Sequence, residues 1–475
     1  MKQPNPNPPK TKIVCTIGPA CDTPEKIKAL IEKGMNVARL NFSHGSHAEH
    51  LEKIKTIRKV SDEMDRSIAI LQDLCGPKIR VGKVKDPGIQ LKAGERLILT
   101  SEDIIGEGNR VSVSYKPLPS EVKVGDIILL ADGMMELVVV ETGEKDISCD
   151  VIIGGTLTSN KGINLPSGTI NAPSLTEKDR LDLTFGIDQG VDFIALSFVR
   201  SAADVMELKK IIETSGKNIP VVAKIEKHEA INNIDGILQA TDVVMVARGD
   251  LGVEIPLEKV PELQKMLVRK ANENGKPVIV ATQMLRSMVD SPRPTRAEAN
   301  DVANAVLDGA DAVMLSEETA SGRYPFEAVE YMAKIARSTE AEYPHDRYLK
   351  LAHSDTTIAK SVAYASCVLG EHLHASAIVA STKSGFTAKQ ISRFRPRSGI
   401  VALSPDKSAL RSLALYWGCF PGFVDVPKNT DDMIEKVAES AVETGWVKKG
   451  DLIVITAGHP VWVEGTTNMM KVKRI

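Results

Sequence analysis

The chain has 475 residues, of which 43% are hydrophobic and 26% are charged, a composition typical of globular proteins. This length exceeds what a single hydrophobic core serves, so about three domains are expected. With 60 Lys and Arg against 62 Asp and Glu, and no apolar run near the roughly 18 residues that span a bilayer, we expect neither nucleic acid nor a membrane among its partners.

The N-terminal segment, MKQPNPNPPK, is rich in Pro and Asn and lacks the apolar stretch of a secretory signal. We interpret it as a frayed chain end rather than a targeting segment. The six cysteines include no C-x-x-C pair, which disfavours a zinc site and a disulfide framework. A soluble protein of the reducing cytoplasm is therefore expected.

The first two thirds of the chain carry short apolar runs rich in Val and Ile, each too short for a helix and followed by an amphipathic stretch. Eight such runs lie near Ile13, Val37, Ile70, Ile194, Val222, Val244, Ile279 and Val313. Between runs, segments 23–33 and 258–274 read as helices that each end at a glycine. Thr295 and Glu298 form a capping-box pattern at the start of another helix. Strands alternating with helices predict an α/β fold, a closed (β/α)8 TIM barrel.

Two further regions break this rhythm. Stretches such as IQLKAGERLILT and VGDIILLADG, between the third and fourth runs, predict a small all-β domain inserted in a βα loop as a lid. Later, the strands SAIVAST, GIVALS, GFVDV and DLIVITAG alternate with helices over 356–369 and 431–444, which predicts an open-sheet α/β domain. The predicted boundaries are 1–77 with 172–343 for the catalytic barrel, 78–171 for the inserted lid and 344–475 for the C-terminal domain.

Barrel enzymes carry their chemistry at the carboxyl ends of the strands, so polar side chains there are candidates for a site. The second run ends in Arg39, Asn41 and Ser43, which share one strand face by the two-residue period. This triple is equally explained if Arg39 pairs with a barrel carboxylate and the other two complete a turn. Other runs end in Asp73, Lys224, Glu226, Arg248, Gly249, Asp250, Thr282, Ser316, Glu317 and Glu318.

Glu226 and Asp250 follow adjacent strands, so two carboxylates should converge where water and backbone oxygens can complete the octahedral shell of Mg²⁺. Lys224 offers a compact positive charge suited to a phosphoryl group in transfer. A buried Lys224–Glu226 ion pair is the purely structural alternative, but packing alone does not explain a ring of polar residues at one barrel end. Gly249 and Asp250 offer unencumbered backbone N–H groups that suit a carboxylate or phosphate oxygen.

Two other signals are weaker. His44, His47 and His50 are spaced by three residues, and solvated histidines explain this spacing about as well as a metal site does. Neither a Walker-type phosphate loop nor the protein-kinase motif set is present, so a nucleotide would be held by other residues.

The motifs TKIVCTIGPA, NVARLNFSHG, AKIEKHEA, VMVARGDLGVEIP, ATQMLRSM and PRPTRAEANDVANAVLDGADAVMLSEETA resemble the pyruvate kinase family, from about Thr11 to the C-terminus. The resemblance implies transfer of a phosphoryl group from phosphoenolpyruvate to ADP, giving ATP and pyruvate, with Mg²⁺ or Mn²⁺ as cofactor. It also implies a homotetramer.

By matching position, Lys224 would stabilise the moving phosphoryl group and Arg39 would grip the phosphate. Glu226 and Asp250 would hold the metal. The backbone of Gly249 and Asp250 would seat the substrate carboxylate together with the hydroxyl of a threonine, and that threonine would join a serine and water in protonating the enolate. The threonine and serine are Thr282 and Ser316, and the positions near the nucleotide are Pro19, Asn41, His44, Arg80 and Lys161.

One departure from the family pattern concerns K⁺. The common form reads Asp-Thr-Lys-Gly-Pro-Glu-Ile-Arg and binds K⁺ through four positions, whereas this chain reads DLCGPKIR. The four positions are here Asn41, Ser43, Asp73 and Leu74. Lys78 stands where the Glu would be, so its ammonium could replace the cation, and Leu74 lacks a hydroxyl ligand. We expect catalysis without K⁺; the alternative is that Lys78 is a solvated loop charge and K⁺ still binds.

The C-terminal domain carries a segment that resembles the family's effector phosphate loop, after a strand and at a helix start. Its residues are Thr382, Lys383, Ser384, Gly385 and Thr387. The family's second-phosphate Trp and Arg find no clear match in the segment around Trp462, which disfavours a bisphosphate sugar. The expected effector is a monophosphate such as a sugar phosphate or AMP.

Two rival functions remain open to the sequence. A barrel lyase or aldolase acting on a related keto acid would also place Glu and Asp on Mg²⁺, but it would need neither the lid nor Lys224 opposite the metal. A non-catalytic scaffold or metabolite sensor would be expected to have lost Lys224, Glu226 or Asp250, and all three are present. ATP formation separates these readings.

Overall fold

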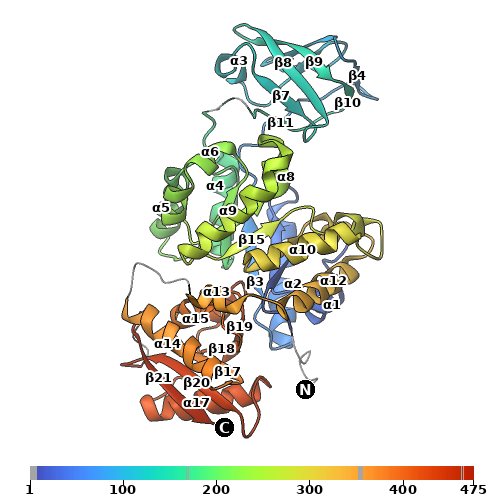
Figure 1. Ribbon diagram of the computed structural model, residues 1–475. Coiled ribbons are helices and arrows are strands. Elements are labelled where there is room, and N and C mark those ends of the chain that lie inside the picture. Colours follow the sequence, from blue (N-terminus) through green and yellow to red (C-terminus); the bar gives the residue numbers. More distant parts are fainter. Residues whose placement is uncertain (1–7, 167, 169–170, 351–356, 462, 464) are drawn as a thin grey trace.

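The computed structural model describes residues 8–166, 168, 171–350, 357–461, 463 and 465–475. Figure 1 shows three bodies along its length: a β domain at one end, a barrel in the middle and an α/β domain at the other end. Residues 1–7 of the N-terminal segment, Thr356 at the expected helix start and Trp462 lie outside the described residues. In the described part of the chain, no helix is long and apolar enough to cross a membrane.

Eight parallel strands close the barrel, in the order β1-β16-β15-β14-β13-β12-β3-β2. They are β1 (Lys12–Thr16), β2 (Val37–Asn41), β3 (Ala69–Asp73), β12 (Phe193–Leu196), β13 (Val221–Ile225), β14 (Val243–Ala247), β15 (Val278–Ala281) and β16 (Ala312–Leu315). Each lies on one of the eight predicted runs, so the predicted TIM barrel is confirmed. The runs are continuously apolar because helices cover the outer face of the sheet and side chains fill the interior.

Helices surround the barrel, and their ends follow the expected signals. The helices are α1 (Pro24–Lys33), α2 (His47–Glu63), α4 (Glu177–Asp188), α5 (Ala202–Thr214), α6 (His228–Asn232), α7 (Ile234–Ala240), α8 (Arg248–Glu254), η1 (Leu257–Lys259), α9 (Val260–Glu273), η2 (Arg286–Val289), α10 (Arg296–Asp308), α11 (Glu317–Ala320) and α12 (Pro325–Glu340). The capping box at α10 is confirmed: the Glu298 N–H donates to Thr295 Oγ1 at 3.2 Å, and the Thr295 N–H donates to Glu298 Oε2 at 2.8 Å.

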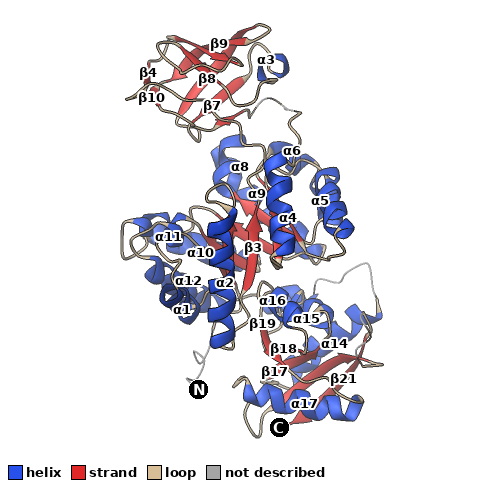
Figure 2. Cartoon of the chain, turned by 180° about the vertical axis from the view of Figure 1, so that it is seen from behind, coloured by secondary structure: helices blue, strands red, loops and turns tan. Residues whose placement is uncertain are grey.

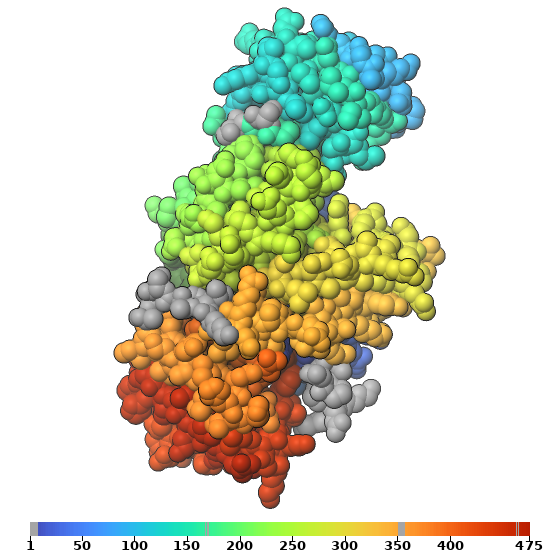
Figure 3. Space-filling view, in the orientation of Figure 1, coloured from blue at the N-terminus to red at the C-terminus, as the bar shows by residue number. Residues whose placement is uncertain are grey.

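The inserted β domain follows β3 and returns the chain to the barrel before α4. Its elements are β4 (Ile89–Leu91), β5 (Arg96–Thr100), β6 (Arg110–Ser112), α3 (Leu118–Glu121), β7 (Ile127–Leu130), β8 (Met135–Thr142), β9 (Asp146–Ile153), β10 (Gly155–Leu157) and β11 (Ile163–Asn164). A six-stranded sheet runs in the order β11-β7-β8-β9-β5-β6, and β10 pairs with β4. Figure 3 shows this domain resting on the barrel over a contact narrower than the domain itself.

The C-terminal domain is a five-stranded open sheet in the order β19-β18-β17-β20-β21, with helices on both faces (Figure 2). Its elements are α13 (His345–Lys350), α14 (Ile358–His372), β17 (Ala377–Ser381), α15 (Phe386–Ser392), β18 (Gly399–Ser404), α16 (Lys407–Leu413), β19 (Cys419–Phe423), α17 (Thr430–Glu443), β20 (Leu452–Gly458) and β21 (Thr467–Arg474). The strand predicted at GFVDV instead begins at Cys419. Sequence analysis did not predict β21, the antiparallel strand at the sheet edge. Its sequence is Lys-rich and largely unburied, as protected edge strands are, so it lacks the apolar run that identified the other strands.

Two arginines of the C-terminal domain, the buried Arg395 and the half-buried Arg411, contact the end of the barrel opposite the predicted site. Both terminal nitrogens of Arg395 donate to Asp311, which precedes β16, at 2.7 Å each. Arg411 donates to Asp192, which precedes β12, at 2.8 Å. Removing one partner of such an ion pair lowers the stability of the junction, because the other charge is then left buried without compensation.

The same junction holds a histidine that should make stability depend on pH. Burial lowers the pKa of His345 from 6.5 to about 4, although its ring bonds to the Arg395 carbonyl oxygen at 2.7 Å. Between pH 7 and pH 5 the unfolded chain takes up a proton that the folded chain does not, so the free energy of unfolding should fall by about 1–2 kcal/mol. His345→Gln should remove that part of the fall, measured as the thermal midpoint at both pH values. The exposed His372→Gln variant should keep it; an unchanged fall in His345→Gln would contradict the assignment.

Candidate active site

Lys224, at the carboxyl end of β13, lies at the centre of the polar ring. Its Nζ is 3.2 Å from Asp73 Oδ1 and 3.0 Å from Glu226 Oε1, and it donates to Ser197 Oγ at 2.7 Å. Burial alone would lower the pKa of Lys224, but the charges of Asp73 and Glu226 raise it above its usual value. The ammonium therefore stays charged inside the barrel mouth. Sequence analysis did not single out Ser197, although the strand-end rule that found its neighbours also applies to it.

Asp73, at the end of β3, pairs with a cation on the adjacent strand β2 and with another on β13, beyond β12. Arg39 Nε donates to Asp73 Oδ2 at 2.6 Å, and a terminal nitrogen of Arg39 donates to Thr16 Oγ1 at 2.9 Å. Burial would raise the pKa of Asp73, but Lys224 and Arg39 together lower it, so the carboxylate is ionised. The pairing of Arg39 with a barrel carboxylate, offered above as the alternative to function, does occur. Because the same carboxylate holds Lys224, it also brings both cations to one place, where a phosphate could bind.

Two carboxylates lie beside this cluster. Glu226 Oε2 accepts from the Phe198 N–H at 2.8 Å, and Phe198 adopts a left-handed φ of 55°. Burial raises the pKa of Glu226, Lys224 opposes this, and the charge of Asp250 raises it further. Among the described residues no three His, Cys, Asp or Glu side chains gather as a closed metal cage. Two carboxylates that leave positions open for substrate oxygens and water fit the way Mg²⁺ is bound in phosphoryl-transfer sites.

The turn at Gly249 differs from the expectation. The predicted open loop is the first turn of α8, and the Gly249 N–H donates to Thr282 Oγ1 at 2.7 Å instead of being unencumbered. Thr282 has a left-handed φ of 71°, and Arg248 holds its carbonyl oxygen at 2.9 Å while pairing with Asp301 at 2.6 Å. The two groups predicted to seat the substrate carboxylate are therefore neighbours that contact each other.

Ser316, after β16, carries a buried hydroxyl that has no hydrogen-bond partner in the described structure. Its N–H donates to Glu318 Oε2 at 2.7 Å, and the other oxygen of Glu318 accepts from the Leu285 N–H at 3.1 Å. Glu318 thus ties the loops after β15 and β16 together rather than facing the site with a free carboxylate.

Comparison with known proteins assigns this arrangement to a family. Residues 8–329 match the family described as pyruvate kinase, barrel domain, and residues 360–473 match pyruvate kinase, alpha/beta domain. The chain belongs to the pyruvate kinase family. Curated pyruvate kinases of Staphylococcus aureus strains MRSA252, USA300 and NCTC 8325 are each 50% identical to it over 469 residues, which cover 98% of this chain and 80% of each relative. As a pyruvate kinase family member, the chain is a phosphotransferase.

The positions matched to the nucleotide in pyruvate kinases fall into two groups. Pro19 and His44 are exposed in the loops after the paired strands β1 and β2, and Asn41, the last residue of β2, is half-buried. Arg80 and Lys161 belong to the inserted β domain, where the backbone of Arg80 forms an isolated antiparallel β-bridge with Gly162. The first group lies on the barrel rim and the second on the domain above it.

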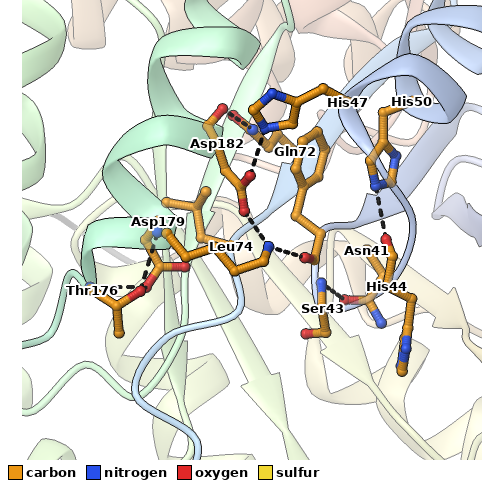
Figure 4. A network of polar contacts seen from close by, with 12 residues as sticks. Asn41, Ser43, His44, His47, His50, Gln72, Leu74, Thr176, Asp179 and Asp182 are labelled. Carbon is orange, nitrogen blue, oxygen red and sulfur yellow. Dashed lines mark hydrogen bonds and ion pairs between the residues drawn. The ribbon is translucent and has the colours of Figure 1, made fainter.

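The four positions that sequence analysis matched to a K⁺ site are largely engaged in hydrogen bonds and ion pairs within the protein. Asn41 Oδ1 accepts from the Ser43 N–H at 3.1 Å, as a turn would require (Figure 4). Asp73 is shared by Arg39 and Lys224. The Leu74 side chain is buried, and the Leu74 backbone carbonyl oxygen accepts a hydrogen bond from Ser197 Oγ at 2.7 Å. Lys78 does not reach these positions by any contact in the described structure; its Nζ lies 3.8 Å from Asp250 Oδ1.

The histidine triplet is neither solvated throughout nor a metal site. Figure 4 shows His47 turned toward Asp182, whose Oδ1 lies 2.7 Å from the ring Nε2, and His50 facing the chain after β2. His50 is only 3% exposed and stacks on Phe42 with ring centroids 3.9 Å apart. Lys178 donates both to Asp182 at 2.6 Å and to the Phe42 carbonyl oxygen at 2.7 Å. This network anchors the loop that carries Ser43 and His44 to α4, and sequence analysis did not find it.

The loop resembling the effector site of pyruvate kinases lines a pocket in the C-terminal domain. Thr382, Lys383, Ser384 and Thr387 contribute to the pocket, opposite the segment around Gly465. Gly385, at the N-cap of α15, has a left-handed φ of 86°, a conformation that glycine adopts without strain. Thr387 Oγ1 lies 2.7 Å from Thr467 Oγ1, which joins the loop to β21.

Proposed function

We propose that the chain transfers the phosphoryl group of phosphoenolpyruvate to ADP, giving ATP and pyruvate, in the cytoplasm and as a homotetramer. The observation that carries the chemistry is Lys224, held protonated between two carboxylates beside Arg39 and Asp250. All six cysteines are free, which suits a reducing compartment. The tetramer is inferred from the family alone.

In this mechanism each residue acts on one part of the substrate. Lys224 and Arg39 bind the phosphoryl oxygens and neutralise their charge as the group moves. Glu226 and Asp250 would hold Mg²⁺ or Mn²⁺, which when bound would supply positive charge against the charge that develops on the phosphoryl group. Thr282 and the Gly249 N–H, 2.7 Å apart, would open to receive the substrate carboxylate.

The product enolate then needs a proton on carbon. In this proposal Ser316 Oγ, which is buried and has no partner in the described structure, relays one through water together with Thr282. Such a relay uses neutral hydroxyls, so it does not disturb the charges that hold the phosphate. The proton comes ultimately from the solvent, and the relay delivers it to the enolate carbon in a site otherwise closed to bulk water.

We assign residues 78–171 the role of a lid over residues 1–77 and 172–343, with 344–475 as the effector-binding domain. Supporting this, the nucleotide positions divide between the barrel rim (Pro19, Asn41, His44) and the inserted β domain (Arg80, Lys161), so a nucleotide bound to both would draw them together. Closure would keep water, a competing phosphoryl acceptor, away from the reaction.

Initial-rate assays test the reaction. ATP and pyruvate should form together from phosphoenolpyruvate and ADP in the presence of Mg²⁺. Cleavage of a keto acid without ADP would support the lyase alternative, and the absence of any turnover would support a sensor. A Glu226→Gln variant, assayed in parallel, separates this activity from a contaminating kinase.

We also propose that catalysis does not require K⁺. The support is local: Lys78 brings an ammonium to 3.8 Å from Asp250, and Leu74 places a buried hydrocarbon where a hydroxyl ligand would be. Turnover should therefore persist when K⁺ is replaced by a bulky organic cation. Strong activation by restored K⁺ would contradict the proposal.

A phosphorylated metabolite with one phosphate is the proposed allosteric effector, bound at Thr382 to Thr387. We expect a sugar monophosphate or AMP to lower the half-saturating phosphoenolpyruvate concentration about fivefold, the usual scale of allosteric coupling. Combining Thr382→Ala with Ser384→Ala should abolish that shift, since both residues line the pocket. Ser376→Ala, at the other end of β17, should retain it. No shift with any monophosphate would contradict the proposal.

A further inference from the structure

Glu254 is a buried carboxylate at the last position of α8, the short helix whose first turn carries Asp250. The residue is 2% exposed. A carboxylate this deeply buried destabilises the fold unless charged or hydrogen-bonding groups surround it. It is not one of the predicted site residues, so its retention in the buried state needs a separate reason.

The partners of Glu254 come from two different bodies of the molecule. Lys227, directly after the metal-site residue Glu226, donates to Glu254 Oε1 at 2.6 Å. Asn164 of β11, in the inserted β domain, donates to the same oxygen at 3.0 Å and is itself 7% exposed. The second oxygen, Oε2, has no hydrogen-bond partner among the described residues; His228 Nδ1 lies 3.6 Å away.

The inserted β domain approaches α8 at three points along its length. Lys78, in the segment that enters the domain, faces Asp250 at 3.8 Å. A β-carbon built on Gly133, in the turn between β7 and β8, would stand 3.8 Å from Val253 Cγ1. Asn164 closes the set at the helix's last residue. Asp250 and Glu254 lie on the same seven-residue helix, about one turn apart. A shift of Glu254 therefore moves Asp250 with it.

We propose that Glu254 is a positioning residue that couples the position of the inserted β domain to the two metal-site carboxylates. With the domain seated as here, Asn164 and Lys227 hold Glu254, and Glu254 in turn fixes α8 with Asp250 and the chain beside Glu226. When the domain swings away, Asn164 leaves and the carboxylate loses half of its hydrogen bonds. The site is therefore fully ordered only while the inserted β domain stays seated on α8. This inference rests on the lid role proposed above.

A double-mutant cycle between Asn164 and Glu254 tests the coupling. Asn164→Ala and Glu254→Gln should each lower kcat about tenfold with less than a twofold change in the half-saturating substrate concentrations, because the contact matters in the closed complex. The double variant should be no slower than the slower single variant, which is the signature of groups acting as a unit. Losses that multiply in the double variant would overturn the coupling.

A charge swap supplies a readout that a merely structural role would not give. Asn164→Asp alone sets two carboxylates against each other and should be slower than Asn164→Ala. Adding Glu254→Gln restores an amide–carboxylate pair with the partners exchanged, and it should recover at least half of the lost rate on a logarithmic scale. A swap variant as slow as the product of its single variants would contradict the proposal.

Amide hydrogen exchange of α8 follows the ordering without relying on activity. With Mn²⁺ and phosphoenolpyruvate bound, the α8 amides of Asn164→Ala should exchange about fivefold faster than in the wild type. Thr156→Ala, which removes a hydrogen bond to Gln90 inside the inserted β domain, should change neither exchange nor kcat. An inactive wild type would defeat the proposed function; an active wild type with unaltered α8 exchange in Asn164→Ala would defeat only the coupling.

Discussion

Replacing Lys224 by Met is expected to lower kcat by about a thousandfold, the scale on which one pre-organised charge acts on a transition state. The Lys224 ammonium lies 3.2 Å from Asp73 and 3.0 Å from Glu226, and these carboxylates keep it protonated. In the proposed mechanism, the migrating phosphoryl group of this variant would lack the positive charge of the ammonium. Lys224→Arg keeps the charge, but its planar fork does not fit between two carboxylates placed for a compact ammonium, so only partial activity should return.

Lys224→Met also leaves the two buried carboxylates, Asp73 and Glu226, without their shared cation, so the stability of this variant should be checked separately. We expect a loss of about 3–5 kcal/mol in unfolding free energy, the usual result of breaking a buried ion pair. Lys209→Met is the matched control: it removes a 2.8 Å ion pair with Asp242 at the opposite end of the barrel and should leave kcat within about twofold. A folded Lys224→Met enzyme that retains a tenth of wild-type kcat would refute the role of Lys224.

The barrel could be predicted from the sequence because its strands are buried on both faces, which makes each one a continuous apolar run. The edge strand β21 could not, since only one of its eight residues is buried and three are Lys or Arg. Helix α8 was missed for a different reason. Gly249 and Gly252 disfavour a helix in isolation, and the helix is held by contacts to Thr282 that only the closed barrel brings near.

The candidate site was predictable to the level of which residues meet, but not of how they pair. The strand-end rule placed Lys224, Glu226 and Asp73 together, because parallel strands in a barrel share one carboxyl end. That Asp73 would hold both Arg39 and Lys224 depends on the register of three strands. The lid contact between Asn164 and Glu254 depends on the docking of two domains and leaves no local pattern in the sequence.

Replacing Lys78 by Glu is expected to make the enzyme depend on K⁺. In the absence of K⁺ the charge reversal near Asp250 should lower kcat about a hundredfold, since one charge at this range acts with a few kcal/mol at an effective dielectric constant near 20. Lys78→Gln removes the charge without reversing it and should lose about tenfold. The first measurement is kcat in K⁺-free buffer, which should fall in the order wild type, Lys78→Gln, Lys78→Glu.

Adding Leu74→Thr to Lys78→Glu gives the site a hydroxyl ligand beside a carboxylate whose negative charge nothing balances. K⁺ should therefore raise the kcat of this double variant at least about tenfold. The wild type should respond less than twofold over the same K⁺ range. Leu74→Thr alone serves as the matched control: with Lys78 still present, the positive charge is already supplied and added K⁺ gains little. If Lys78→Glu kept full activity without K⁺, Lys78 would be a solvated loop charge that does not stand in for the cation.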